Sequence, residues 1–253
     1  MKPDRPNRLQ IYGERCSGTN WVAQLCRRNF LALRPCDDFG WKHGWIQGDV
    51  EQARDCLFVV VHRDPFDWLR SLHRQPWHTA AALRDVPFAR FIREAWHCEW
   101  GRDMDLPADD PRIGTEMLHE RDPRTGARFA NAMRLRTAKH RAWASLRGRV
   151  AHLEFVRYED VLRAPREFVA KLAQTHGLRR WPWFRGVDTF KGGATPFRPS
   201  TYAPIDPADL DWIAAELDAA CEAAHGYDIA ARISELRAAA LDPPTAHGKL
   251  SAP

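Results

Sequence analysis

The segment Gly13–Trp21 combines residue types that could bind an anion. It reads GERCSGTNW, with Gly13 and Gly18 at the spacing of a Walker P-loop. A glycine-rich turn from a strand into a helix directs backbone N–H groups and the positive helix end toward an anion such as phosphate. Thr19 and Asn20 replace the lysine and the hydroxyl residue of a Walker loop, so an ATP site here would lack its usual phosphate lysine and magnesium ligand. A tight connection that needs glycine for steric reasons is the alternative explanation.

The segment Val59–Ser71, VVVHRDPFDWLRS, contains a second pair of candidate anion ligands. Arg63 follows an unbroken apolar run, and the carboxyl ends of strands form the edge at which open α/β sheets bind ligands. Ser71 lies on the helix that Asp64-Pro65 predicts, because Asp is a good N-cap and Pro fits the first helical position. One anion beside this helix could therefore contact both Arg63 and Ser71. A capped helix with a solvated arginine also explains Asp64-Pro65, but it gives Arg63 no role.

His43 is the candidate for proton transfer. It lies in the aromatic segment Trp41–Trp45, WKHGW, directly after Lys42. Histidine titrates closest to neutrality, so His43 could remove the proton of an attacking hydroxyl. A histidine in an aromatic-lined turn without a catalytic role is the alternative.

Strands and helices alternate in the elements that must position these residues. The expected strands are 9–13, 57–61 and 150–158. The expected helices contain Trp21–Phe30, begin at Pro65, bury Phe168–Ala173 before ending at Gly177, and run from Pro207 to Gly226. This alternation predicts an α/β fold with a parallel sheet flanked by helices.

Three further segments lack such a clear pattern. Gly101–Thr125 has little periodicity and is expected to be a surface excursion, of the kind that forms a lid. The basic stretch Arg134–Arg141 is expected to be a solvated face or to support a phosphate. Residues 242–253 have no apolar face and are expected to form a flexible tail, so a single domain is predicted for residues 1–241.

Composition narrows the class of protein. The chain has 253 residues, of which 44% are hydrophobic and 28% charged, which is typical of a folded globular protein and excludes disorder. No apolar run is long enough to span a bilayer, and the N-terminus lacks the apolar core of a signal peptide, so a cytoplasmic protein is expected. The net charge of +5 favours anionic partners. The cysteines lie too far apart for zinc-binding CxxC pairs and are expected to be reduced, so no structural metal is indicated.

The segments resemble the sulfotransferases that use 3′-phosphoadenosine 5′-phosphosulfate (PAPS) as donor. Arg15–Trp21 is similar to the family's 5′-phosphosulfate loop, usually KSGTTW, and Arg63 with Ser71 reproduces the RxPxxxxxS element that holds the 3′-phosphate. Tyr158-Glu-Asp160 is similar to the segment whose tyrosine approaches the adenine, and Phe190-Lys191-Gly192 resembles the late RKG phosphate clamp. The four motifs occur in the order found in the family.

The resemblance implies one domain of P-loop NTPase-like topology. It implies transfer of a sulfuryl group from PAPS to a hydroxyl or amine acceptor, leaving adenosine 3′,5′-bisphosphate (PAP), without a metal. His43 would be the catalytic base, and Arg15 or Lys42 would stabilise the leaving oxygen. The donor would be bound by residues of the four motifs: Arg15, Cys16, Ser17, Gly18, Thr19, Asn20, Trp21, Arg63, Ser71, Tyr158, Lys191 and Gly192.

Cys16 departs from the family's pattern, because a lysine commonly stands there. A neutral thiol cannot balance charge on the leaving oxygen, so Arg15 and Lys42 are the nearest cationic candidates. Two alternatives stay open: a non-catalytic protein of the same fold that binds PAP or nucleic acid, and a P-loop kinase. For an enzyme, the expected acceptor is a small molecule, carbohydrate or lipid, and a nucleic-acid partner is not expected.

Overall fold

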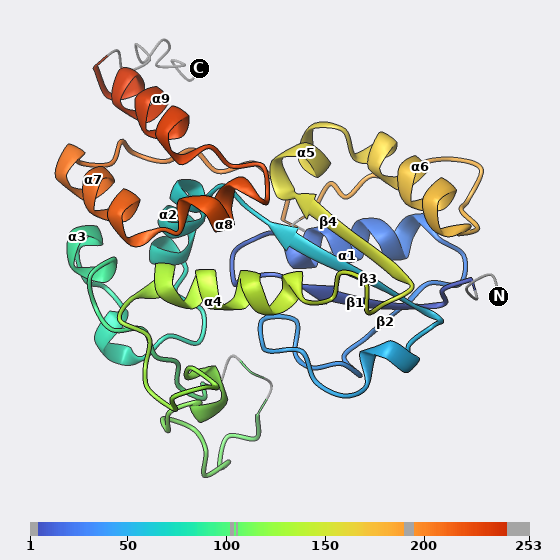
Figure 1. Ribbon diagram of the computed structural model, residues 1–253, viewed down its shortest axis with the longest axis horizontal. Coiled ribbons are helices and arrows are strands. Elements are labelled where there is room, and N and C mark those ends of the chain that lie inside the picture. Colours follow the sequence, from blue (N-terminus) through green and yellow to red (C-terminus); the bar gives the residue numbers. More distant parts are fainter. Residues whose placement is uncertain (1–4, 102–103, 105, 190–194, 242–253) are drawn as a thin grey trace, which may run out of the picture.

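A parallel sheet forms the centre of the computed structural model, which describes residues 5–101, 104, 106–189 and 195–241. Within those residues the strand order is β2-β1-β3-β4 (Figure 1). The strands are β1 (Arg8–Tyr12), β2 (Arg34–Cys36), β3 (Cys56–His62) and β4 (His152–Arg157). Every residue of β3 is buried, as expected for a central strand covered on both faces. Because all the neighbouring strands pair in parallel, their carboxyl ends meet at one edge.

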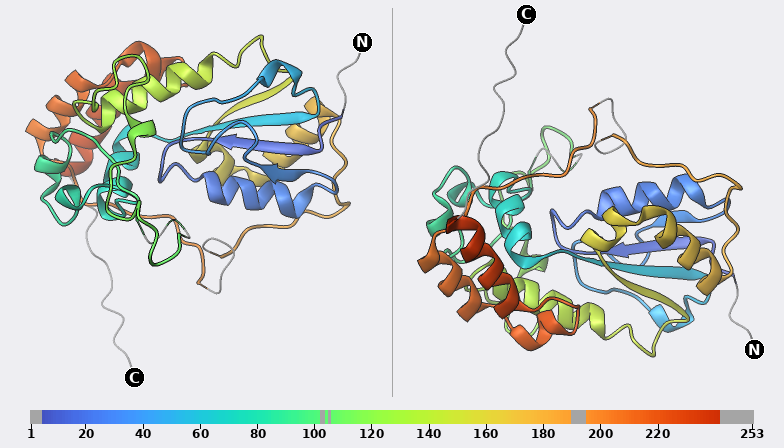
Figure 2. Two further views of the ribbon diagram at one scale, coloured as in Figure 1. Left: turned by 90° about the horizontal axis from the view of Figure 1, so that it is seen from below. Right: turned by 90° about the horizontal axis from the view of Figure 1, so that it is seen from above.

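Helices cover the two faces of the sheet. One face packs against α1 (Thr19–Asn29) and α6 (Pro165–His176), and the other packs against the end of α4 (Ala132–Ala144) (Figure 2). Successive side chains of a strand point to opposite faces, so Val59 belongs to the first core and Phe58 to the second. In the second core Phe58 is joined by the fully buried Trp143 of α4.

A helical lobe lies beyond the carboxyl edge of the strands (Figures 1 and 2). It consists of α2 (Pro65–Arg74), α3 (Phe88–Phe91), α7 (Pro207–Glu216), α8 (Ala219–Ala223) and α9 (Ile229–Leu241). The first part of α4 packs into this lobe through Met133 and Leu135, so α4 connects the lobe to the sheet. The short helix α5 (Tyr158–Arg163) directly follows β4.

The α/β fold with a central parallel sheet flanked by helices is confirmed, and it is consistent with a P-loop-like topology. Helix α2 begins at Pro65 as predicted, because the Asp64 carboxylate accepts a hydrogen bond of 2.8 Å from the N–H of Asp67. Helix α6 ends at Gly177, which adopts a left-handed φ of 64°.

The predicted helix from Pro207 to Gly226 is wrong, because it is divided into α7 and α8. Leu217 takes an extended conformation after α7, and the Asp218 carboxylate accepts a hydrogen bond of 2.8 Å from the N–H of Cys221. Asp218 therefore starts a new helix, α8, in the middle of the predicted one.

Two segments predicted to lie on the surface contribute buried charges. Glu120, in the excursion 101–125, is 3% exposed and ion-pairs with Arg15 and Lys139. Arg136, in the basic stretch, is fully buried against Glu222. The sequence gives no sign of these ion pairs, because their members lie far apart along the chain.

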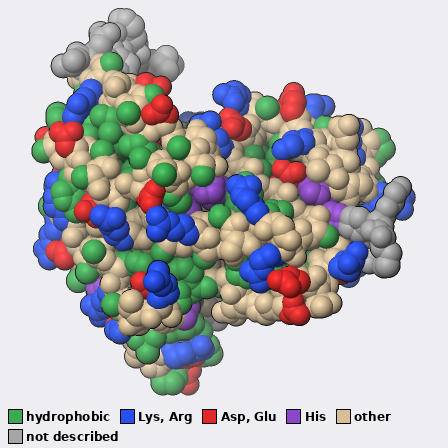
Figure 3. Space-filling view, in the orientation of Figure 1, with side chains coloured by type: hydrophobic (Ala, Val, Ile, Leu, Met, Phe, Trp, Pro, Cys, Tyr) green, Lys and Arg blue, Asp and Glu red, His purple; other side chains and the backbone are tan. Residues whose placement is uncertain are grey.

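The predicted tail, residues 242–253, lies outside the described residues. No helix in the described part of the chain is long and apolar enough to cross a membrane. On the face shown in Figure 3, side chains of both charges are interspersed over the surface.

Candidate functional site

A cavity of about 600 Å³ lies between the carboxyl edge of the sheet and the helical lobe. It is lined by residues that follow each of the strands and by residues of α2. The sequence-predicted residues that line it are Arg15, Cys16, Gly18, Thr19, Asn20, Trp21, Lys42, His43, Arg63, Ser71 and Tyr158. Ser17 is fully buried and is not part of the lining, and the predicted clamp residues Lys191 and Gly192 lie outside the described residues.

The loop after β1 turns tightly into α1. The N–H of Ser17 donates to the carbonyl oxygen of Glu14 at 3.1 Å, and α1 begins at Thr19. Gly18 has a φ of +90°, and a Cβ there would lie 2.3 Å from a ring carbon of Tyr158. Glycine is therefore required at this position for both conformation and space. The first-turn N–H groups of α1 begin at the cavity wall, where they favour a bound anion.

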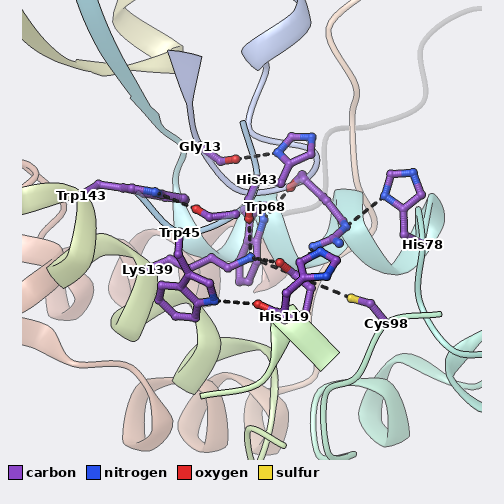
Figure 4. Close-up of polar contacts among 12 residues, drawn as sticks. Gly13, His43, Trp45, Trp68, His78, Cys98, His119, Lys139 and Trp143 are labelled. Carbon is purple, nitrogen blue, oxygen red and sulfur yellow. Dashed lines mark hydrogen bonds and ion pairs between the residues drawn. The ribbon is translucent and has the colours of Figure 1, made fainter. Parts of the chain in front are cut away.

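The imidazole side chain of His43 is held against this loop by a hydrogen bond to the backbone of Gly13. The carbonyl oxygen of Gly13 lies 2.6 Å from His43 Nδ1 and can only accept, so Nδ1 carries the proton (Figure 4). The other ring nitrogen, Nε2, is then unprotonated, and its lone pair can accept a proton. Burial, followed by the charges of Arg15 and Lys42, lowers the pKa of His43 well below its usual value of 6.5. The ring is therefore neutral at pH 7 and suited to act as a base.

Two side chains of α4 hold the turn that carries His43 through hydrogen bonds to its backbone (Figure 4). Lys139 donates through Nζ to the His43 carbonyl oxygen and contacts both carboxylate oxygens of Glu120 at 2.9 and 3.0 Å. Trp143 donates from its indole nitrogen to the carbonyl oxygen of Gly44 at 3.1 Å. These buried contacts give the His43 backbone one position relative to the sheet.

Two cations lie beside the loop. Arg15 is 3% exposed, ion-pairs with Glu120 at 2.8 Å and places its guanidinium 4.7 Å from the ring centre of Trp41. Lys42 donates from Nζ to the Asn20 side-chain oxygen at 2.6 Å. Both cations line the cavity, and Arg15 shares the Glu120 carboxylate with Lys139.

Arg63 connects the loop with α2. Its guanidinium donates to the carbonyl oxygen of Cys16 at 2.7 Å and to the hydroxyl of Tyr202 at 2.9 Å. Ser71 and Arg74, one turn apart on α2, line the same corner of the cavity. Two arginines and a hydroxyl thus gather where the family resemblance predicts a 3′-phosphate.

Cys16 forms part of the wall of this corner. Burial raises the pKa of its thiol, although Ser71 and Arg63 act in the opposite direction. The side chain is therefore a neutral thiol at pH 7, as expected for a small loop residue and not for a nucleophile. Its backbone adopts a left-handed φ of 64°.

Aromatic rings continue the cavity wall beside this corner, where the Arg63 guanidinium lies 5.1 Å from the ring centre of Tyr158. Trp21 meets the Tyr158 ring edge-on with centres 6.3 Å apart, and Phe197 lies 6.0 Å from Trp21. The indole N–H of Trp21 donates to the carbonyl oxygen of Val187 at 3.3 Å, which fixes the ring. These rings offer flat apolar surface of the kind that a nucleobase can stack on.

Several lining residues were not predicted from the sequence. Arg74 could have been found, because a residue three positions after Ser71 shares its helix face. His78 accepts a hydrogen bond of 3.3 Å from Arg15 but lies in an irregular segment with no recognisable pattern. The segment 197–202 folds over α2, where the Tyr202 ring lies 4.9 Å from the Arg70 guanidinium. This contact is long-range and has no local signal.

Comparison with protein-family models and comparison with curated proteins found no match for this chain.

Proposed function

We propose that this protein is a sulfotransferase that moves a sulfuryl group from PAPS to a hydroxyl or amine acceptor. The observation that carries the proposal is a single cavity that holds both a cationic phosphate corner at Arg63 and a neutral, oriented His43. The same cavity borders the N-terminus of α1 and a set of aromatic rings, so each part of a phosphorylated adenine nucleotide has a matching surface.

Unsatisfied buried donors support an anionic ligand at this place. Arg15 Nη2 and Arg63 Nε are buried and have no hydrogen-bond partner among the described residues, and both side chains line the cavity. Buried polar atoms normally have a partner, so two such donors at one cavity are consistent with acceptors supplied by a ligand. Phosphate and sulfate oxygens are acceptors of the required kind.

The proposed roles follow from these contacts. Arg63, Ser71 and Arg74 bind the 3′-phosphate, while the first-turn N–H groups of α1 bind the 5′-phosphosulfate. His43 Nε2 accepts the acceptor's proton, because Nδ1 is already bonded to Gly13. Lys42 stabilises the negative charge on the leaving phosphate, and fixing donor and acceptor in one cavity contributes by orientation.

The acceptor would enter beside Trp41, Trp77 and His78, which line the cavity near His43. A small molecule, a carbohydrate or a lipid hydroxyl fits this proposal. We also propose that the reaction occurs in the cytoplasm, where the widely spaced cysteines of this sequence would stay reduced.

The decisive experiment follows transfer of labelled sulfuryl from PAPS to panels of hydroxylated sugars, lipids and phenols. PAP release is measured in parallel, so that turnover is detected whichever acceptor is used. A thermal-shift panel with PAP, adenosine 5′-phosphosulfate and ATP, each with magnesium or EDTA, is the matched binding test. Stabilisation by PAP in EDTA supports the proposal. Magnesium-dependent stabilisation by ATP with none by PAP would indicate a kinase, and PAP binding without any turnover would indicate a non-catalytic protein.

A further inference from the structure

Three buried histidines meet outside the cavity described above. His62 is the last residue of β3, His140 lies on α4, and His225 follows α8. One ring nitrogen of each lies within 4.8 Å of one ring nitrogen of each of the others. Their residues are 1%, 0% and 9% exposed, respectively.

Each of these rings has a nitrogen without a hydrogen-bond partner among the described residues. The atoms are His62 Nε2, His140 Nδ1 and His225 Nδ1. A buried polar atom without a partner is destabilising, and one such atom in each of three touching side chains is an unusual arrangement. A bound cation that accepts a lone pair from each ring would supply the partner that these nitrogens lack.

Glu14 supplies a carboxylate next to this cluster. Its Oε1 lies 2.5 Å from His140 Nε2, and the same nitrogen lies 3.2 Å from Nδ1 of His62, whereas Nδ1 of His140 has no hydrogen-bond partner among the described residues. Metal-binding histidines commonly donate their other N–H to a carboxylate, which orients the ring and raises its basicity.

An entry path reaches the cluster. A second cavity, of about 480 Å³, is lined by His62 and His225 and is distinct from the one that contains His43. The rings of His62 and His225 stack with centres 3.8 Å apart, so the His225 ring must turn for both lone pairs to point at one ion. His225 lies between the end of α8 and Gly226, and it lines this second cavity.

We propose that His62, His140 and His225 bind one divalent transition-metal ion of the zinc class, with Glu14 as the carboxylate that orients His140. Imidazole nitrogens suit zinc, copper, nickel and iron, and three protein ligands leave a fourth position for water or a ligand from the second cavity. The ion would join β3, α4 and the turn after α8. The cysteine spacing gives no indication of this site, and three histidines so far apart along the chain form no motif.

The test uses the purified, untagged full-length chain after metal removal with a chelator. Zn²⁺ binding is measured by calorimetry, and Co²⁺ is added as a spectroscopic probe whose visible bands report its coordination. We expect one equivalent of either ion per chain. His225→Ala should abolish stoichiometric binding, and Glu14→Gln should keep one equivalent but weaken it about 10- to 100-fold.

His176→Ala is the matched control. His176 is also buried, and its Nδ1 lies 3.1 Å from Nδ1 of His152, but no third histidine joins this pair within the described residues. This variant should bind the metal as the natural chain does.

His225 is the residue to change first because it lies nearest the surface, and circular dichroism checks that the variant folds. If His225→Ala is unfolded, His225→Gln serves the same purpose with a side chain of similar size. Absence of binding to the natural chain, or equal affinity in a folded His225 variant, overturns the proposal. Both measurements are made without PAPS, so their outcome is independent of the proposed sulfuryl transfer.

Discussion

His43 Nδ1 donates to the carbonyl oxygen of Gly13 at 2.6 Å, while the N–H of Gly13 donates to the carbonyl oxygen of Lys42 at 3.0 Å. The proposed base is therefore clamped at two points to the first residue of the proposed phosphosulfate loop. A base and an anion-binding loop that share these bonds keep their separation when either side of the cavity moves. This coupling gives His43 one tautomer and one orientation before any ligand binds.

Replacing His43 should separate catalysis from nucleotide binding. His43→Ala should lower sulfuryl transfer by about 10² to 10⁴, because general-base assistance is lost. PAP affinity, measured by calorimetry, should stay close to that of the natural chain, because Nε2 serves the acceptor. His119→Ala is the control, since His119 is a nearby exposed histidine that does not line the cavity. Turnover of His43→Ala within threefold of the natural enzyme would show that His43 is not the base.

The pH dependence of transfer follows from the low pKa of His43. The neutral ring is the active form, so activity is lost only when the pH falls through the folded pKa, which lies well below 6.5. We expect kcat/KM to stay level from pH 8 down to pH 6.5 and to decline only at lower pH. An acid limb with its midpoint at pH 6.5 or above would contradict the assignment. Because the unfolded histidine takes up a proton near pH 6.5 while the folded one does not, the same shift lowers stability as the pH falls below that value.

Arg63→Ala should weaken PAP binding. Loss of a charge-assisted contact to the 3′-phosphate removes about 1.5 to 3 kcal/mol, or about 10- to 150-fold in affinity. Arg70→Ala is the matched control, because Arg70 lies beside the same Tyr202 ring as Arg63 but does not line the cavity. Adenosine 5′-phosphosulfate lacks the 3′-phosphate, so its affinity should change much less in Arg63→Ala. Equal losses for the two nucleotides would place Arg63 elsewhere on the ligand.

The sequence predicts those parts of this molecule that local patterns control. The Asp64 cap, the buried strand before Arg63 and the glycine turn at Gly18 are short-range features, and each is found where expected. The break between α7 and α8 is not predicted, because Asp218 can cap a helix or lie within one and tertiary packing decides between them. Glu120 illustrates the larger gap, since its burial depends on partners that only folding brings together.

Glu120 should be essential to stability. Burial raises the pKa of the Glu120 carboxyl group, but the positive charges of Arg15 and Lys139 outweigh this effect. The pKa is lowered to about 2, compared with an ordinary value of 4.5. Its contribution is complete above pH 4.5 and is lost as the pH falls toward 2. Glu120→Gln leaves two buried cations without their carboxylate and should lower the free energy of unfolding by about 3 to 5 kcal/mol at pH 7, measured by urea titration.

Glu116→Gln is the control for Glu120. Glu116 pairs with Arg121 at 2.8 Å and with Arg128 at 2.7 Å, but these partners lie nearer to solvent. The same substitution there should change the urea midpoint much less. If the two variants lose the same stability, burial of the Glu120 ion pairs is not the cause.

Lys42 should supply the charge that a lysine at position 16 would provide in the resembled family. Lys42 lies over Asn20, and both Lys42 and Cys16 line the cavity. Lys42→Ala should lower kcat by about 10² to 10³, as expected when one electrostatic contact to the transition state is removed. Cys16→Ser alone should be nearly silent, because the raised pKa of Cys16 already keeps the side chain neutral.

The double variant Cys16→Lys with Lys42→Ala tests the position of that charge. Position 16 already holds a non-glycine residue with a left-handed φ, so lysine brings no new backbone penalty, and its ammonium group can reach the cavity that Cys16 lines. We expect single-turnover rates at least about tenfold above those of Lys42→Ala, which corresponds to about 1.4 kcal/mol of recovered transition-state stabilisation. PAP affinity, measured for all variants, separates a catalytic rescue from restored binding. A double variant no faster than Lys42→Ala, with PAP still bound, would show that Lys42 acts through the structure of the turn that carries His43 and not through its charge.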